Sequence, residues 1–235
     1  MRIVVTAAVR SECTGWRRFS GPAGDIHVVT TGIGMRGSRD QLRDLLAMPA
    51  DFCIASGLGG SLTNRHAVGS IVVARGIKTE ATTTILTSDG GLVDAAVRCG
   101  ANPVSFFFTS KSIVNSPSER LRLSSGSDAI DMESFHVLAE ARRAGVPAVA
   151  IRAISDTPDE PLPIDLSSVV SKRGDIDWLP LFWQLLKQPV RIKEFLRFSR
   201  ASSNAAGNLA RFLGRYFKFL AANEGLRTPV DSIAR

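Results

Sequence analysis

Two acidic side chains, Glu133 and Asp156, stand at the ends of neighbouring elements in the middle of the chain. The segment DAIDMES begins as a short apolar strand and turns into a helix that stops at Gly145, and a buried strand over 146–154 then leads to Ser155 and Asp156. Ligands of open α/β sheets bind at the carboxyl ends of strands, so carboxylates placed there could exchange protons with a ligand. A carboxylate at a helix start is also a common cap, and this structural role of Glu133 stays open.

Three further signals follow expected strands earlier in the chain. A third carboxylate, Glu12, comes after the first strand, and the glycine-containing segments 32–34 and 56–60 come after the next two. Glycine lets a backbone approach a ligand or another segment closely. Each signal alone has an ordinary structural explanation, because a GxG sequence is usually only a turn and a lone glutamate is usually solvated.

Strands and helices alternate along the first 156 residues. Apolar, β-branched runs predict strands over residues 2–8, 26–30, 52–55, 71–74, 104–108, 128–131 and 146–154. Helical spacing predicts helices over residues 38–48, 92–99 and 134–145, and the segment 56–60 is expected to break the third strand. This alternation predicts a layered α/β fold with a largely parallel or mixed sheet.

Length and composition limit the protein class. The 235 residues, of which 44% are hydrophobic, suit one domain or one domain with an appendage. No apolar run reaches the roughly 18 residues needed to span a bilayer, and the first residues lack the layout of a secretory signal. The three cysteines are far apart and form no metal-binding spacing. We therefore expect a cytoplasmic protein without a metal or another cofactor.

The C-terminal region differs from the rest in charge. Eight Lys/Arg and one Glu lie between residues 187 and 218, so this region carries the whole formal charge of +7. We expect a neutral domain over residues 1–175 and a basic amphipathic helical extension over residues 176–235. Its apolar side chains recur at helical spacing; these are Leu209, Phe212, Leu213, Tyr216, Phe217 and Leu220. Its basic side chains form a second stripe, made of Arg211, Arg215 and Lys218.

Three partners could account for this amphipathic pattern. The extension could pack on the domain or a second subunit, or it could lie at a membrane surface. A basic stretch also attracts nucleic-acid phosphates. No nucleic-acid-binding module accompanies it, so we expect no nucleic-acid partner.

Seven segments occur in an order that resembles the nucleoside phosphorylase and nucleosidase superfamily, and in particular the methylthioadenosine/S-adenosylhomocysteine nucleosidases. They are AAVRSE, TTGIGM, SGLGGSL, VGSIVVA, FTSKSIVN, DAIDMES and RAISD, and they span residues 1–156. The resemblance implies a three-layer α/β/α fold with a mixed central sheet. It also implies cleavage of the N-glycosidic bond of a purine nucleoside, and a homo-oligomer.

The resemblance assigns the reacting roles to three carboxylates. Asp156 would protonate N7 of the departing purine, Glu133 would bind the ribose hydroxyls, and Glu12 would activate the attacking water. An acid at the base and anions near the sugar would each stabilise one half of the charge that forms as the bond breaks. The implied supporting residues are Val114 and Ile113 at the base, Met132, Gly57, Leu58 and Gly59 at the sugar, and Ser155 beside Asp156.

One departure from the family pattern concerns the nucleophile. Phosphorylases place an arginine before the glycine-rich segment, where this chain has Ile54. This difference favours hydrolysis over phosphorolysis. Arg36, near an expected helix start, could still hold an anion.

The basic extension adds a narrower resemblance, to the hopanoid-associated phosphorylases. This implies a lipid-linked substrate of the adenosylhopane type and contact of the C-terminal helices with the inner face of a membrane. The predicted function is therefore a purine nucleosidase that releases adenine from an adenosine-type nucleoside with an apolar 5′ substituent. A phosphate-dependent phosphorylase, a methylthioadenosine/S-adenosylhomocysteine nucleosidase and a non-catalytic purine- or lipid-binding module remain alternatives.

Overall fold

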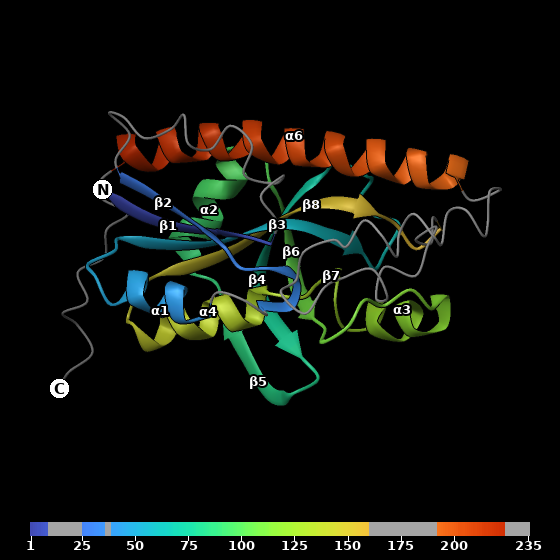
Figure 1. Ribbon diagram of the computed structural model, residues 1–235, viewed down its shortest axis with the longest axis horizontal. Helices are drawn as coiled ribbons and strands as arrows, with labels where there is room; N and C mark the ends of the chain where they lie inside the picture. Colours follow the sequence, from blue (N-terminus) through green and yellow to red (C-terminus); the bar gives the residue numbers. More distant parts are fainter. Residues whose placement is uncertain (9–24, 36–38, 160–191, 224–235) are drawn as a thin grey trace.

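A computed structural model of the chain describes residues 1–8, 25–35, 39–159 and 192–223 (Figure 1). The strands are β1 (Arg2–Ala7), β2 (Asp25–Thr30), β3 (Phe52–Ser61), β4 (Ile71–Thr79), β5 (Thr82–Thr87), β6 (Asn102–Thr109), β7 (Ala129–Asp131) and β8 (Ala148–Asp156). The helices are the short η3 (Ile33–Met35), α1 (Arg39–Leu46), α2 (Gly90–Arg98), α3 (Pro117–Ser124), α4 (Ser134–Arg143) and α6 (Ile192–Ala222).

The strands form one mixed sheet with the order β2-β1-β3-β7-β6-β4-β5, and β8 pairs with both β3 and β4. Strand β3 runs parallel to β1 and β8 and antiparallel to β7, whereas β4 is parallel to β6 and antiparallel to β8. Because β6 and β7 are also paired, the strands β3, β7, β6, β4 and β8 close a ring. The predicted mixed sheet is therefore confirmed.

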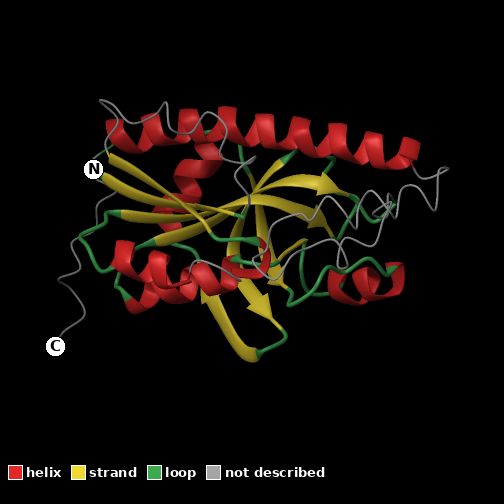
Figure 2. Cartoon of the chain, viewed as in Figure 1, coloured by secondary structure: helices red, strands yellow, loops and turns green. Residues whose placement is uncertain are grey.

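Helices cover both faces of this sheet, as Figures 1 and 2 show. Alternate side chains of β1, β3 and β8 form one apolar core with α2 and α6. The intervening side chains form a second core with α1 and α4. The period-two alternation of a strand thus places neighbouring residues in opposite layers, and it yields the three-layer α/β/α arrangement.

Helix α6 is part of the main core. Its predicted apolar stripe, from Leu209 to Leu220, is fully buried against β8, β3, β4 and α2. Tyr216 donates a hydrogen bond of 2.8 Å to the carbonyl oxygen of Leu92, and Asn208 donates one of 2.9 Å to that of Gly69. The extension therefore packs on the domain in its C-terminal half, while Arg211, Arg215 and Lys218 are exposed.

Three features of the elements differ from the sequence-based prediction. The glycine-rich segment does not break β3, because residues 57–60 stay paired with β8, with a register shift after Gly59. Strand β5 was not predicted, since its threonines are mostly exposed and give no clear alternation of burial. Helix α3 was not predicted either, because its 8 residues, PSERLRLS, are largely polar.

The predicted domain boundary at residue 175 lies outside the described residues. None of the helices in the described part of the chain combines the length and the apolar character needed to cross a membrane.

Candidate active site

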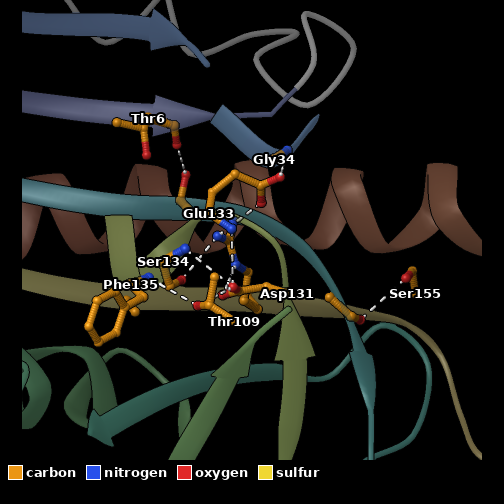
Figure 3. Close-up of polar contacts among 12 residues, drawn as sticks. Thr6, Gly34, Thr109, Asp131, Glu133, Ser134, Phe135 and Ser155 are labelled. Atoms are coloured by element: carbon orange, nitrogen blue, oxygen red, sulfur yellow. Dashed lines mark hydrogen bonds and ion pairs between the residues drawn. The ribbon is translucent and has the colours of Figure 1, made fainter. Parts of the chain in front are cut away.

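Glu133 lies at the point where β7 meets α4, and its side chain turns away from the helix. Its Oε1 accepts a hydrogen bond of 2.8 Å from the backbone N–H of Gly34, and its Oε2 lies 3.4 Å from Nη2 of Arg152 (Figure 3). It makes no capping hydrogen bond, although it occupies the N-cap position of α4. The structure therefore excludes the capping role that the sequence left open for this carboxylate.

Asp131 caps the helix instead. Its Oδ1 accepts hydrogen bonds from the backbone N–H groups of Glu133 and Ser134, each at 3.2 Å, and from the hydroxyl of Thr109 at 2.8 Å. Asp131 thus satisfies the donors at the start of α4, so the side chain of Glu133 is released for another contact.

Arg152, on β8, connects these two carboxylates. Its Nε donates to Oδ2 of Asp131 at 3.0 Å, and its Nη2 donates to the hydroxyl of Ser134 at 3.0 Å and to Glu133 at 3.4 Å. The side chain of Arg152 is 1% exposed, and those of Asp131 and Glu133 are 0% and 7% exposed. A buried cation needs such paired carboxylates, and this network fixes the direction of Glu133.

Asp156 ends β8, four residues after Arg152, and is also buried. Its Oδ1 accepts a hydrogen bond of 2.7 Å from the hydroxyl of Ser155, which also donates to the carbonyl oxygen of Gly59 at 3.2 Å. Its Oδ2 lies 2.5 Å from Nη2 of Arg120, and both side chains of this ion pair are less than a tenth exposed. Ser155 thus contacts Asp156 directly, and its supporting role stays a prediction.

Two glycines on β3 leave room for groups of the site. A Cβ atom on Gly59 would lie 3.0 Å from the carbonyl oxygen of Ile130 and 3.4 Å from the side chain of Arg152. A Cβ atom on Gly60 would lie 2.9 Å from Oδ2 of Asp156. Glycine at these two positions therefore lets β3 lie close to Ile130, Arg152 and Asp156.

The other predicted residues in the described part of the chain lie on β3, after β7 and between β6 and α3. The buried Val114 accepts a hydrogen bond of 2.9 Å at its carbonyl oxygen from Nε of Arg120, which ties it to Asp156. Met132 directly precedes Glu133 and is half-buried, as are Ile113 and Leu58. Gly57, with φ 152°, pairs with Arg152 across β3 and β8.

Glu12 and Arg36 lie outside the described residues, so their predicted roles stay predictions. Sequence reasoning missed the three buried groups that organise the site, Asp131, Arg152 and Arg120. The motif strings contain Asp131 and Arg152, and a charged residue inside each otherwise buried strand was the available signal. Arg120 gave no signal, since arginine in a polar helix is ordinarily exposed.

The described residues contain no group of three or more His, Cys, Asp or Glu side chains arranged to hold a metal ion. The polar groups are carboxylates, guanidinium groups, hydroxyls and backbone amides. Such a set can bind a polyhydroxylated ring and move protons at buried carboxyl groups.

Comparisons with known proteins agree with this geometry. A sequence model described as the phosphorylase superfamily matches residues 106–173. This segment contains Val114, Arg120, Asp131, Glu133 and Asp156. The resemblance to the phosphorylase superfamily is confirmed. No curated protein sequence matches the chain significantly.

Solved structures show the same fold. A 5′-methylthioadenosine/S-adenosylhomocysteine nucleosidase from Helicobacter pylori superposes with a TM-score of 0.66 at 16% identity, over 93% of this chain and 98% of the other. The corresponding enzyme from Neisseria meningitidis gives 0.63 at 20% identity, over 92% and 98%. A futalosine hydrolase mutant from Helicobacter pylori gives 0.58 at 17% identity, over 66% and 90%. The α/β/α phosphorylase-like fold predicted from the sequence is therefore confirmed across nearly the whole chain.

Proposed function

We propose that this protein is a purine nucleosidase, which hydrolyses the N-glycosidic bond of an adenosine-type nucleoside and releases adenine. The observation that carries this proposal is the pair of buried carboxylates, Glu133 and Asp156, which lie near the ends of β7 and β8 and are each paired with a buried arginine, Arg152 and Arg120. The phosphorylase-superfamily match over residues 106–173 and the fold shared with nucleosidases support an N-glycosidic bond hydrolase or a nucleoside phosphorylase.

The two carboxylates have different surroundings, and this supports different roles. Glu133 accepts a backbone N–H and an arginine N–H, which suits an ionised group that binds ribose hydroxyls. Asp156 accepts a hydrogen bond from Arg120, as does the carbonyl of Val114, which we assign to the purine edge; this shared donor supports Asp156 as the acid that gives its proton to N7. Glu12 is proposed to activate the attacking water, Met132 and residues 57–59 to contact the sugar, and Ile113 to pack on the base.

Water is the proposed nucleophile. Ile54, where phosphorylases carry an arginine, is fully buried on β3 among apolar side chains. It offers no donor to a phosphate, so a phosphate site would need other cations, such as Arg36. The deciding measurement is adenine release from adenosyl substrates in phosphate-free buffer and again with added phosphate. If release requires phosphate, the activity is that of a phosphorylase and the nucleosidase proposal is wrong.

Asp156→Asn tests the acid directly. The amide keeps the size of the carboxyl group but carries no transferable proton, so we expect kcat to fall by about 10²- to 10⁴-fold. Unchanged adenine release would remove Asp156 from the reaction. Purine binding without turnover of any nucleoside by the wild-type protein would instead favour a non-catalytic module.

For the substrate we propose an apolar 5′ substituent, of the adenosylhopane type. The first turns of α6 support this, because Ile192 and Leu196 are 39% and 48% exposed and are accompanied by the basic Lys193 and Arg197. Apolar side chains with basic neighbours are typical of helices that lie at a lipid surface. A panel of adenosyl compounds with 5′ groups of increasing length measures this preference. A preference for the short methylthio group would instead indicate methylthioadenosine as the substrate.

Contact with a membrane surface is a separate proposal, since it concerns localisation at the inner face of a membrane. We expect sedimentation with anionic vesicles that weakens with salt, because part of the attraction is screened charge. The double variant Ile192→Glu, Leu196→Glu should reduce it, whereas substitutions in the buried stripe would test folding. Equal sedimentation of both proteins would contradict the proposal.

A homo-oligomer, which the resemblance implies, is tested by light scattering.

A further inference from the structure

Arg120 is a buried cation that joins three segments of the candidate site. Its side chain is only 4% exposed, whereas the apolar side chain of the next residue on helix α3, Leu121, is 74% exposed. Nε donates to the carbonyl oxygen of Val114 at 2.9 Å, Nη2 donates to Oδ2 of Asp156 at 2.5 Å, and Nη1 lies 3.4 Å from the carbonyl oxygen of Thr157.

Packing of helix α3 on the domain does not by itself require a buried guanidinium group at Arg120. A guanidinium loses its hydration when it is buried, and replacing such an ion pair with apolar side chains is often neutral or stabilising. The fold anchors α3 through Leu123, which packs with Leu62, Val114 and Ile130. The position of Arg120, at hydrogen-bond distance from both the expected acid and the expected base-binding carbonyl, points to a role in the chemistry of the site.

We propose that Arg120 is a positioning residue for glycosidic bond cleavage, which acts by holding Asp156 and the Val114 carbonyl at a fixed separation and by stabilising the Asp156 carboxylate that forms when the proton leaves. This inference rests on the proposed nucleosidase function. It adds a group that acts through Asp156 and does not itself touch the substrate.

The proton balance shows where the cation would act. As the C1′–N9 bond breaks, its electron pair stays with the purine, and the proton of Asp156 moves to N7. Water adds to C1′ and loses one proton to a base, which we assign to Glu12. Asp156 is then a carboxylate whose Oδ2 is paired with Nη2 of Arg120. A cation at this distance stabilises the charged form of the acid and so favours proton transfer to the base.

Three variants test the proposal. Arg120→Met removes the charge and all three contacts. Arg120→Lys keeps the charge but lacks the planar fork that reaches three partners. Arg122→Met is the matched control, since Arg122 lies on the same helix with its side chain 70% exposed and forms a surface ion pair with Glu119 at 3.8 Å.

Steady-state kinetics with an adenosyl substrate provide the first readout. For Arg120→Met we expect kcat to fall about 10²-fold or more, because Asp156 and the Val114 carbonyl lose their shared donor. Arg120→Lys should recover part of this loss, since it keeps the charge. Arg122→Met should match the wild type, and a wild-type kcat in Arg120→Met would overturn the proposal.

A double-mutant cycle provides the second readout. In an Asp156→Asn background, Arg120→Met should cause less than a threefold further loss of kcat, because the group through which it acts is already absent. Full additivity of the two losses would overturn the proposal. Circular dichroism of each variant separates this result from unfolding, and Arg120→Lys serves as the test if Arg120→Met does not fold.

The outcomes for the two proposals can be distinguished. If the wild type releases no adenine, the proposed function fails irrespective of Arg120. If the wild type is active and Arg120→Met keeps its kcat, only the role of Arg120 fails. Adenine affinity, measured by calorimetry, gives an independent check: we expect weaker binding in Arg120→Met, since the Val114 carbonyl is no longer held. Equal affinity would contradict that part of the proposal.

Discussion

Replacing Gly60 with alanine is the sharpest test of the site, because it adds one methyl group beside Asp156. The new Cβ would lie 2.9 Å from Oδ2, 3.3 Å from Oδ1 and 3.2 Å from Cγ2 of Ile130. Ordinary contact begins at 3.4 Å, so the carboxyl group would have to move by about 0.5 Å. It has little room to do so, since Arg120 and Ser155 hold its two oxygens at 2.5 and 2.7 Å.

The expected effect on activity exceeds the effect on folding. Overpacking of this kind costs about 1–3 kcal/mol of the free energy of unfolding. A displacement of the acid of this order should reduce kcat for adenine release by about 10- to 100-fold. The control is Gly90→Ala, because no atom lies within 4 Å of the added Cβ at the start of α2. This variant should keep wild-type kcat and full stability.

The assay is adenine release at 25 °C, run with a thermal unfolding curve for each variant. A folded Gly60→Ala protein with wild-type kcat would refute the assignment of Asp156 to the reaction, since the structure leaves no alternative position for that methyl group. A loss of kcat in Gly90→Ala would show that adding a methyl group disturbs the fold in general, so the loss in Gly60→Ala could not be attributed to Asp156.

Further predictions concern stability and reactivity. Phe212→Ala should destabilise the protein by about 3–5 kcal/mol in urea unfolding, because the ring is fully buried in the main core; a loss below 1 kcal/mol would contradict this packing. Tyr216→Phe removes the buried hydrogen bond to the Leu92 carbonyl and should cost about 0.5–1.5 kcal/mol in the same assay. Burial lowers the pKa values of His136 and His66, with Arg39 adding to this for His136 and Arg65 for His66. The unfolded chain therefore binds more protons just below pH 6.5, so Tm should fall between pH 7.5 and 5.5; an unchanged or higher Tm would contradict it. Burial raises the pKa of the Cys53 thiol to about 12, so iodoacetamide at pH 8 should modify this cysteine only after denaturation, as mass spectrometry would show.

The fold was largely predictable from local patterns. The long apolar runs of β1, β4 and β8 predict buried strands. The helical spacing of apolar residues predicts the helices α1, α2 and α4. The strand order was not predictable, because the closing pairs of β8 with β3 and β4 join residues distant in the sequence. The continuation of β3 through its glycines was also missed, since glycine ordinarily interrupts a strand and only the approach of Asp156 and Arg152 explains it here.

The site was predictable to the extent that its carboxylates lie at strand ends. Glu133 and Asp156 follow buried strands, and this is visible in the sequence. Their partners were not visible, because the contact of Glu133 with the Gly34 N–H spans 99 residues and that of Arg120 with Asp156 spans 36. The capping role shows the same limit. Both Asp131 and Glu133 precede α4, and only the geometry shows that Asp131 binds the free N–H groups.

The burial of α6 has a consequence for biosynthesis. The core that it completes contains Ile3 and Val5 near the start of the chain as well as Leu213 and Leu220 near its end. A ribosome delivers α6 after the strands that it covers, so the strand that carries Arg152 and Asp156 lacks this part of its apolar cover until α6 has emerged from the exit tunnel. Until then the nascent chain would expose the side chains that α6 buries, and chaperones that bind apolar segments would be expected to bind it there.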